Sequence, residues 1–303
     1  GPPYAPTTWP LGGIPKPTVD IPVQSVFLFL YILSAITHMT IYQLNRRKGH
    51  KFLMSQLLFG FSMARIVTSI MRISSIALPH DISLAIAAQI FTAAGVLIIF
   101  IINLIFTQRL MRASHPDLGW HKFFSLAFKV LYAVVLIAII MVITVVVQTF
   151  YTLNPRIRNI DRGIQLFGVT YFAIVSFIPI PIVLLGLVIP RRHNLDKFGA
   201  GRWRTKVRVL LLSAVLVCFG ASYRAATSWK TPVPRTQPMP AYLNKGAFYI
   251  ADFGVEIIVL FLYAFLRVDL RFHIPDGARG YGSYGSAHLP GKQLEEESRA
   301  TTA

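Results

Sequence analysis

Long apolar segments recur seven times along the chain, separated from one another by proline, glycine or charged residues. They cover residues 22–44, 52–76, 83–108, 123–150, 163–189, 207–228 and 247–267. A helix rises about 1.5 Å per residue, so about 20 apolar residues cross a hydrocarbon layer roughly 30 Å thick. The pattern predicts an all-α, polytopic membrane protein, with a seven-helix transmembrane bundle over residues 22–267.

The composition supports this interpretation. The chain has 303 residues, of which 54% are hydrophobic and 14% are charged, whereas about a quarter of the residues of a soluble domain are charged. The net charge is +18, and the basic residues lie mostly between the apolar segments. This placement favours anionic lipid headgroups over nucleic acid as partners. The single cysteine, Cys218, excludes an intramolecular disulfide.

Lysine and arginine are distributed unevenly among the loops. The first, third and fifth loops carry four, three and six of them, whereas the second, fourth and sixth carry none, three and three. Because basic loops stay on the cytoplasmic side, the N-terminus is predicted outside and the C-terminus inside, as in receptors. Residues 1–21 would then be an extracellular segment. Residues 268–303 would be a cytoplasmic tail, mostly disordered because it is rich in glycine and polar residues.

Charged residues within the apolar segments are the candidate functional residues. In the second segment, Arg65 and Arg72 continue a polar stripe with Ser62 and Ser69 at i, i+3, i+7 and i+10 spacing. Such a stripe lies on one helix face and points into the bundle or into a cavity. The candidate site comprises two acids and a tyrosine of the seventh segment and three arginines: Arg65, Arg72, Arg224, Tyr249, Asp252 and Glu256.

Counting residues from the helix ends places these groups at similar depths in the outer half of the bundle. A lone charge in lipid costs several kcal/mol, so we expect them to pair. Three hypotheses remain open: Arg65 and Glu256 lock two helices together, the group forms a polar site for an anionic or zwitterionic ligand at the base of an outward-facing cavity, or Glu256 relays protons. Asp252 and Glu256 are i, i+4 neighbours, so they are predicted to share a helix face with Tyr249.

The fifth loop forms a second candidate region. Its six basic residues predict a cytoplasmic basic loop that contacts anionic headgroups or an unidentified protein partner: Arg191, Arg192, Lys197, Arg202, Arg204 and Lys206. Pro179 and Pro181 predict a kink in the fifth helix. His38 is the one histidine well inside a segment, and it is expected to hydrogen-bond a neighbouring group.

Enzyme chemistry has little support in the sequence. A metal site needs several converging His or acidic ligands, and none is predicted. There is no Gly-x-Ser-x-Gly elbow and no phosphate-binding glycine loop. We therefore expect no catalytic activity and no cofactor.

Four stretches carry a resemblance to a known family: "GGIPKPTVDIPV", "THMTIYQLNRRKGHKFLMS", "FGFSMARIVTSIMRI" and "FLYAFLRVDLRFHIPDGA". Together they resemble an uncharacterised fungal family of seven-pass integral membrane proteins, a domain of unknown function. A more distant likeness, carried by "ASYRAATSW" and the acid-bearing seventh segment, is to the fungal lipid-translocating exporter family. The resemblance implies a fungal integral membrane protein and supplies no activity.

Three functions are compatible with these features. The first is a non-enzymatic, receptor-like sensor with an outward-facing polar site for a small molecule or lipid. The second is a lipid or amphiphile translocator that uses the same site, and the third is a structural membrane organiser. Outward topology favours the plasma membrane over the endomembrane system.

Overall fold

The computed structural model describes residues 1–4, 6–49, 52–94, 97–275 and 277–285. Within these residues the chain forms helices and no β-strand, and seven helical spans are long and apolar enough to cross a membrane. The predicted all-α class and the seven spans are therefore confirmed. The chain is an integral membrane protein.

The helices follow in this order: α1 (Pro17–Arg47), α2 (Leu53–Ala77), α3 (Ile82–Ala94), α4 (Leu97–Ser114), α5 (Pro116–Gly119), α6 (Lys122–Tyr151), α7 (Pro155–Phe177), α8 (Pro179–Val188), α9 (Trp203–Trp229), the 3-10 turn η1 (Ala241–Leu243), α10 (Lys245–Phe248), the π-helical turn η2 (Tyr249–Gly254), α11 (Val255–Phe265) and α12 (Val268–Arg271). The third span consists of α3 and α4, the fifth of α7 and α8, and the seventh of α10, η2 and α11.

Two helices begin earlier than the apolar pattern indicates, because their first turns are polar. α1 begins at Pro17 and not at residue 22, and α7 begins at Pro155 and not at residue 163. Proline suits the first helical turn because its missing N–H needs no partner there. The side chain of Asn154 also accepts a hydrogen bond from the Arg156 N–H at 3.0 Å. This cap satisfies one of the free amides at the start of α7.

The fifth span changes direction where proline interrupts its hydrogen bonds. α7 ends at Phe177, and α8 begins at Pro179. Pro179 and Pro181 lack the N–H that would bond to the preceding turn. The third span comprises α3 and α4, and residues 95–96 between them lie outside the described residues.

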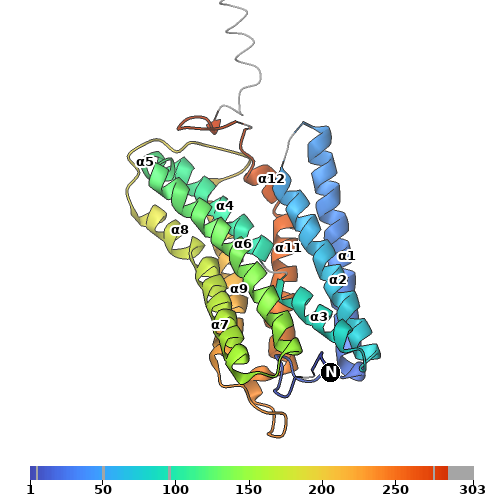
Figure 1. Ribbon diagram of the computed structural model, residues 1–303. Coiled ribbons are helices and arrows are strands. Elements are labelled where there is room, and N and C mark those ends of the chain that lie inside the picture. Colours follow the sequence, from blue (N-terminus) through green and yellow to red (C-terminus); the bar gives the residue numbers. More distant parts are fainter. Residues whose placement is uncertain (5, 50–51, 95–96, 276, 286–303) are drawn as a thin grey trace, which may run out of the picture.

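The helices surround α4, which packs against α2, α6, α7, α8 and α9 (Figure 1). α1 and α2 lie side by side, and α11 packs between α1 and α9. Phe100 and Phe106 of α4 are almost fully buried, whereas Leu136, Ile137 and Ile140 of α6 are exposed. The exposed apolar side chains are suited to lipid acyl chains.

The two ends of the bundle differ in what covers them. The N-terminus, the start of α7 and the segment after α9 lie at one end, here called the N-terminal face (Figure 1). The other end, the C-terminal face, carries α5 and α12. At the N-terminal face, residues 6–15 form a strap that pairs with the sixth loop through an antiparallel bridge between Thr8 and Pro234. The strap closes one side of the bundle end.

Gly12 fixes the path of this strap over the helices. Its φ angle is 83°, in the left-handed region that favours glycine. A Cβ at this position would lie 2.8 Å from the ring of Phe248. The Gly12 N–H also donates to the Leu243 carbonyl at 3.1 Å, which ties the strap to η1.

The tail is more ordered than its composition predicts, in the part that the structure describes. Residues 277–285 pack against the fifth loop, where the Asp196 carboxylate accepts hydrogen bonds from the N–H groups of Gly282 and Tyr284 at 3.0 and 3.3 Å. The Tyr284 ring is 1% exposed and contacts the rings of Trp120 and Phe198. The sequence did not reveal this carboxylate as a partner of the tail. Residues 286–303 lie outside the described residues.

Candidate functional site

Arg65 and Glu256 form an ion pair between α2 and α11. The Arg65 Nε donates to Glu256 Oε2 at 2.6 Å, and Arg65 Nη2 donates to Oε1. The two residues are 1% and 2% exposed. The structure thus brings together the two groups that depth counting placed at one level. A two-point contact of this kind fixes direction as well as distance.

Arg65 and Glu256 each have further partners. Arg65 Nη1 donates to the carbonyls of Phe91 and Thr92, at 3.3 and 3.1 Å, in the last turns of α3. The Tyr31 hydroxyl donates to Glu256 Oε2 at 3.0 Å. The pair therefore joins α1, α2, α3 and α11 in one network.

Arg224 and Asp252 form a second ion pair, between α9 and η2. The Arg224 Nη2 and Nε atoms lie 2.8 and 3.2 Å from Asp252 Oδ1. The other oxygen, Oδ2, is buried and has no hydrogen-bond partner among the described residues. Arg224 is 21% exposed and Asp252 is 5% exposed, so the pair lies at the edge of the buried region.

The two acids of the seventh span form ion pairs with different helices, although both residues line one small cavity. Asp252 contacts α9, whereas Glu256 contacts α1 and α2. Glu256 lies in the first turn of α11, whereas Asp252 lies in the π-helical turn η2. Gly220 of α9 packs on this turn, where a Cβ would lie 2.5 Å from the Ala251 carbonyl oxygen.

Arg72 lies among aromatic rings. Its guanidinium carbon is 4.8, 5.9 and 5.8 Å from the ring centroids of Phe248, Tyr249 and Phe253. Its Nε atom is buried and has no hydrogen-bond partner among the described residues. Cation–π contacts of this kind compensate part of the desolvation of the guanidinium. The Nε atom of Arg65 donates to Glu256, whereas the Nε atom of Arg72 has no such acceptor among the described residues.

Tyr249 contacts Asp20, a site residue that the sequence analysis did not identify. Its hydroxyl donates to Asp20 Oδ1 at 2.9 Å, and Lys245 forms an ion pair with Oδ2 of the same carboxylate. The sequence places Asp20 in the extracellular segment, yet this residue lies in the first turn of α1 and is 2% exposed. The Asp20 carboxylate accepts a hydrogen bond from the Lys16 N–H at 2.6 Å. An acidic residue at the start of an apolar segment is typical of the first turn of a helix, and this signal was available in the sequence.

A cavity of about 430 Å³ opens beside these groups at the N-terminal face. Its walls come from the strap, α2, α3, α6, α7, α9 and α10, and its lining includes Pro6, Pro10, Pro15, Arg72, Ala85, Ala88, Gln89, Val142, Val146, Arg162, Gln165, Leu166, Val169, Arg224, Ser228 and Phe248. Three arginines and no carboxylate stand among its lining residues. The cavity is therefore cationic on one side and apolar on another.

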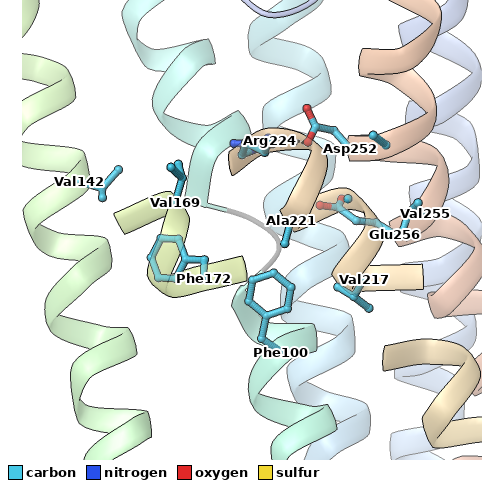
Figure 2. Close-up of a pocket in the computed structure, with 12 residues that line it drawn as sticks. Phe100, Val142, Val169, Phe172, Val217, Ala221, Arg224, Asp252, Val255 and Glu256 are labelled. Atoms are coloured by element: carbon cyan, nitrogen blue, oxygen red, sulfur yellow. Dashed lines mark hydrogen bonds and ion pairs between the residues drawn. The ribbon is translucent and has the colours of Figure 1, made fainter. Parts of the chain in front are cut away.

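A smaller cavity of about 50 Å³ adjoins the first, and the two share Val142, Val169 and Arg224. Figure 2 shows Phe100 and Phe172 on its apolar side and Arg224 with Asp252 on its polar side. Arg224 borders both cavities, so an occupant of the larger one would meet the Arg224–Asp252 pair.

The basic loop is mostly exposed, with one exception. Arg191, Arg192, Lys197, Arg202 and Arg204 are exposed, and Arg191 lies 5.4 Å from the Trp203 ring centroid. Lys206 is 3% exposed, and its ammonium donates to the Phe198 carbonyl. It cannot reach a headgroup, because α9 begins at Trp203 and turns this side chain into the bundle. The prediction of six headgroup contacts is wrong at Lys206.

Two other polar features of the sequence concern histidine and metal ligands. His38 Nε2 lies 3.2 Å from the Leu260 carbonyl oxygen, which is the hydrogen bond expected of a buried histidine. Within the part of the chain that the structure describes, no three His, Cys, Asp or Glu side chains are grouped as a metal site would require.

Residues 199–273 match a family described as Protein of unknown function (DUF3112). This region is about a quarter of the chain and runs from the end of the basic loop through α12, so it includes both carboxylates of the seventh span. Over this region the chain is similar to an uncharacterised family, as the resemblance implied. No curated protein and no solved structure matches the chain.

Proposed function

We propose that this protein is a non-enzymatic membrane sensor of receptor-like topology, with the N-terminal face outside. The observation that carries the proposal is the cavity of about 430 Å³ at that face. Its size falls within the range of about 300–1,000 Å³ that is usual for small-molecule sites. The distribution of basic residues supports the orientation, since the loops at the opposite face carry more of them. The fungal resemblance and this topology favour the plasma membrane.

Arg224 provides a route from the cavity to the rest of the bundle. It lines the cavity and holds Asp252, which belongs to η2. A ligand that competes for the guanidinium would release the carboxylate and favour a different turn at this point. Single π-helical turns inside α-helices are frequent at functional sites. A change in η2 would continue directly into α11.

The basic loop is the proposed output region at the C-terminal face. Its five exposed basic residues suit anionic headgroups or an acidic protein surface. It also contacts the tail through Asp196 and α12 through Gly199, where a Cβ would lie 2.4 Å from the Arg271 carbonyl oxygen. A shift of α11 would therefore reach this loop through packed backbone.

The packing below the cavity supports a sensor more than a translocator. Phe106 stacks on Phe272 at a centroid distance of 4.1 Å and contacts Tyr263 at 5.8 Å. Tyr263 and the Ser213 hydroxyl both hydrogen-bond Asn103, which closes the interior further. A lipid headgroup moving from one face to the other would have to displace this cluster. The translocator and organiser remain the alternatives.

A fluorescent label in the basic loop tests the sensor. The variant Cys218→Ser with Lys197→Cys carries one dye, and the protein is placed in lipid nanodiscs. Compounds that raise the melting temperature of the protein should also change the dye emission in a saturable way. Replacing Arg224 with Gln should abolish the change in emission. Binding that leaves the dye unaffected would contradict a sensor.

A second assay addresses the translocator directly. Fluorescent phospholipids are followed across the bilayer of proteoliposomes that contain wild type or Glu256→Gln. We expect no movement above that of empty liposomes. Movement that requires the protein and falls in the variant would replace the sensor with the translocator.

A further inference from the structure

We propose that the larger cavity binds an amphiphile with one apolar chain and an anionic headgroup, either a carboxylate or a phosphate. This inference rests on the ligand-binding function proposed above and names the class of ligand. It follows from the charge of the lining and from the apolar wall that continues into the smaller cavity.

The charge of the lining selects an anion. Arg72 of α2, Arg162 of α7 and Arg224 of α9 line one cavity, and only Arg224 has a carboxylate within ion-pair distance among the described residues. Arg162 uses Nη2 on the Lys230 carbonyl, at 3.0 Å, which leaves its charge uncompensated. Walls of low dielectric concentrate such a positive potential. A cationic headgroup would be repelled, and a neutral one would gain nothing from it.

Arg72 is the proposed centre of the headgroup site. Arg72 lines the cavity, and no carboxylate among the described residues lies within ion-pair distance of it. The rings of Phe248, Tyr249 and Phe253 hold the guanidinium in place. A carboxylate or phosphate in the cavity would meet the charge of this guanidinium, and guanidinium groups bind both anions in a two-point geometry.

The apolar wall provides a place for the chain of the amphiphile. Val142 and Val146 of α6 face Leu166 and Val169 of α7 across the larger cavity. Val142 and Val169 also line the smaller cavity (Figure 2), which continues to Phe100, Phe172 and Val217. An apolar chain that starts near the arginines would thus run along these valines toward a pocket of phenylalanines. Each buried methylene would contribute about 0.8 kcal/mol.

Four probes with the same ten-carbon chain test the class: decyl phosphate, decanoate, decanol and decyltrimethylammonium. The full chain is placed in phosphatidylcholine nanodiscs, and binding is measured by calorimetry and by the shift in melting temperature. We expect one or both anionic probes to bind at least tenfold more tightly than decanol, and the cationic probe not to bind. The stronger anionic probe distinguishes a phosphate ligand from a carboxylate one.

Arginine variants locate the headgroup. Arg72→Gln and Arg162→Gln should each weaken binding of the anionic probe at least tenfold and leave binding of decanol unchanged. Arg158→Gln is the matched control, since Arg158 lies one turn before Arg162 on α7 but donates to the Thr152 carbonyl and does not line the cavity. Arg72→Lys should retain part of the affinity, because it keeps the charge and loses the two-point contact. Melting without probe identifies any variant that has not folded.

Val169→Trp separates failure of this inference from failure of the proposed function, because it fills the space shared by both cavities. If anionic and neutral probes bind equally and Val169→Trp abolishes both, the anionic class is overturned and a ligand-binding cavity remains. If no probe shows binding that Val169→Trp reduces, both the ligand class and the cavity as a ligand site are overturned.

Discussion

Arg65 on α2 and Glu256 on α11 form a buried two-point ion pair, and the same guanidinium reaches the carbonyls of Phe91 and Thr92 on α3. One arginine thereby holds three helices. This relationship explains why an arginine lies deep within an apolar segment. It also makes the pair the place where a loss of one partner should be most costly.

A double-mutant cycle measures this cost. Arg65→Ala and Glu256→Ala should each destabilise the folded protein by about 3–5 kcal/mol, because each leaves an unpaired buried charge. The double variant should lose less than the sum of the single variants, since neither charge then remains. The measurement is thermal unfolding of the purified protein in detergent. Small and additive effects would show that the pair does not hold the helices together.

Gly220 should not tolerate a side chain. Gly220→Ala places a methyl group 2.5 Å from the Ala251 carbonyl oxygen, and such overpacking costs about 1–3 kcal/mol. Gly163→Ala is the matched control, because a Cβ at Gly163 of α7 meets nothing within 4 Å. That variant should unfold at or slightly above the wild-type temperature, since alanine favours helix by up to about 1 kcal/mol. Equal stability of the two variants would contradict close packing of α9 on η2.

Asp269, at the C-terminal face, should make stability depend on pH. Burial raises the pKa of its carboxyl, but hydrogen bonds from Arg267 and Asn45 outweigh burial and hold the pKa below its ordinary value. A lowered pKa in the folded state stabilises the protein above the unfolded pKa of about 3.9, and this stabilisation is lost as the pH falls through the folded value.

The variant Asp269→Asn tests whether the ionised carboxylate stabilises the protein. It should melt below wild type at pH 7, and the difference should narrow as the pH falls below about 4. Asp117→Asn is the control, because that carboxylate is 66% exposed. A difference between wild type and Asp269→Asn that stays constant with pH would mean that the ionised carboxylate does not contribute.

Asp196 should hold the described part of the tail against the fifth loop. Asp196→Ala removes the acceptor of the Gly282 and Tyr284 N–H groups. Trypsin should then cleave after the exposed Arg279 faster, by roughly the factor of 10 that a loss of about 1.4 kcal/mol implies. Asp81→Ala, an exposed residue just before α3, should leave the cleavage rate unchanged. An unchanged rate in Asp196→Ala would show that other contacts hold residues 277–285.

The sequence by itself determined the seven spans and the common depth of Arg65 and Glu256 in the membrane. The length of an apolar run reports the thickness of hydrocarbon that it crosses, so seven runs predicted seven spans. The fixed rise of a helix placed Arg65 and Glu256 at one depth before their helices were known to touch. The stripe of Ser62, Arg65, Ser69 and Arg72 indicated the interior face of α2, and Ser62 and Ser69 hydrogen-bond Ser34 and Gln24 of α1.

The tertiary structure alone decided how these side chains are oriented and what they meet. Asp252 pairs with Arg224 of α9, whereas Glu256 pairs with Arg65 of α2, and spacing within one helix does not decide between these partners. Arg72 meets rings instead of an acid, and Lys206 binds a carbonyl of its own loop. The strap over the cavity depends on a contact between Thr8 and Pro234. Residue spacing reports the geometry within one helix, whereas these contacts join residues of different elements.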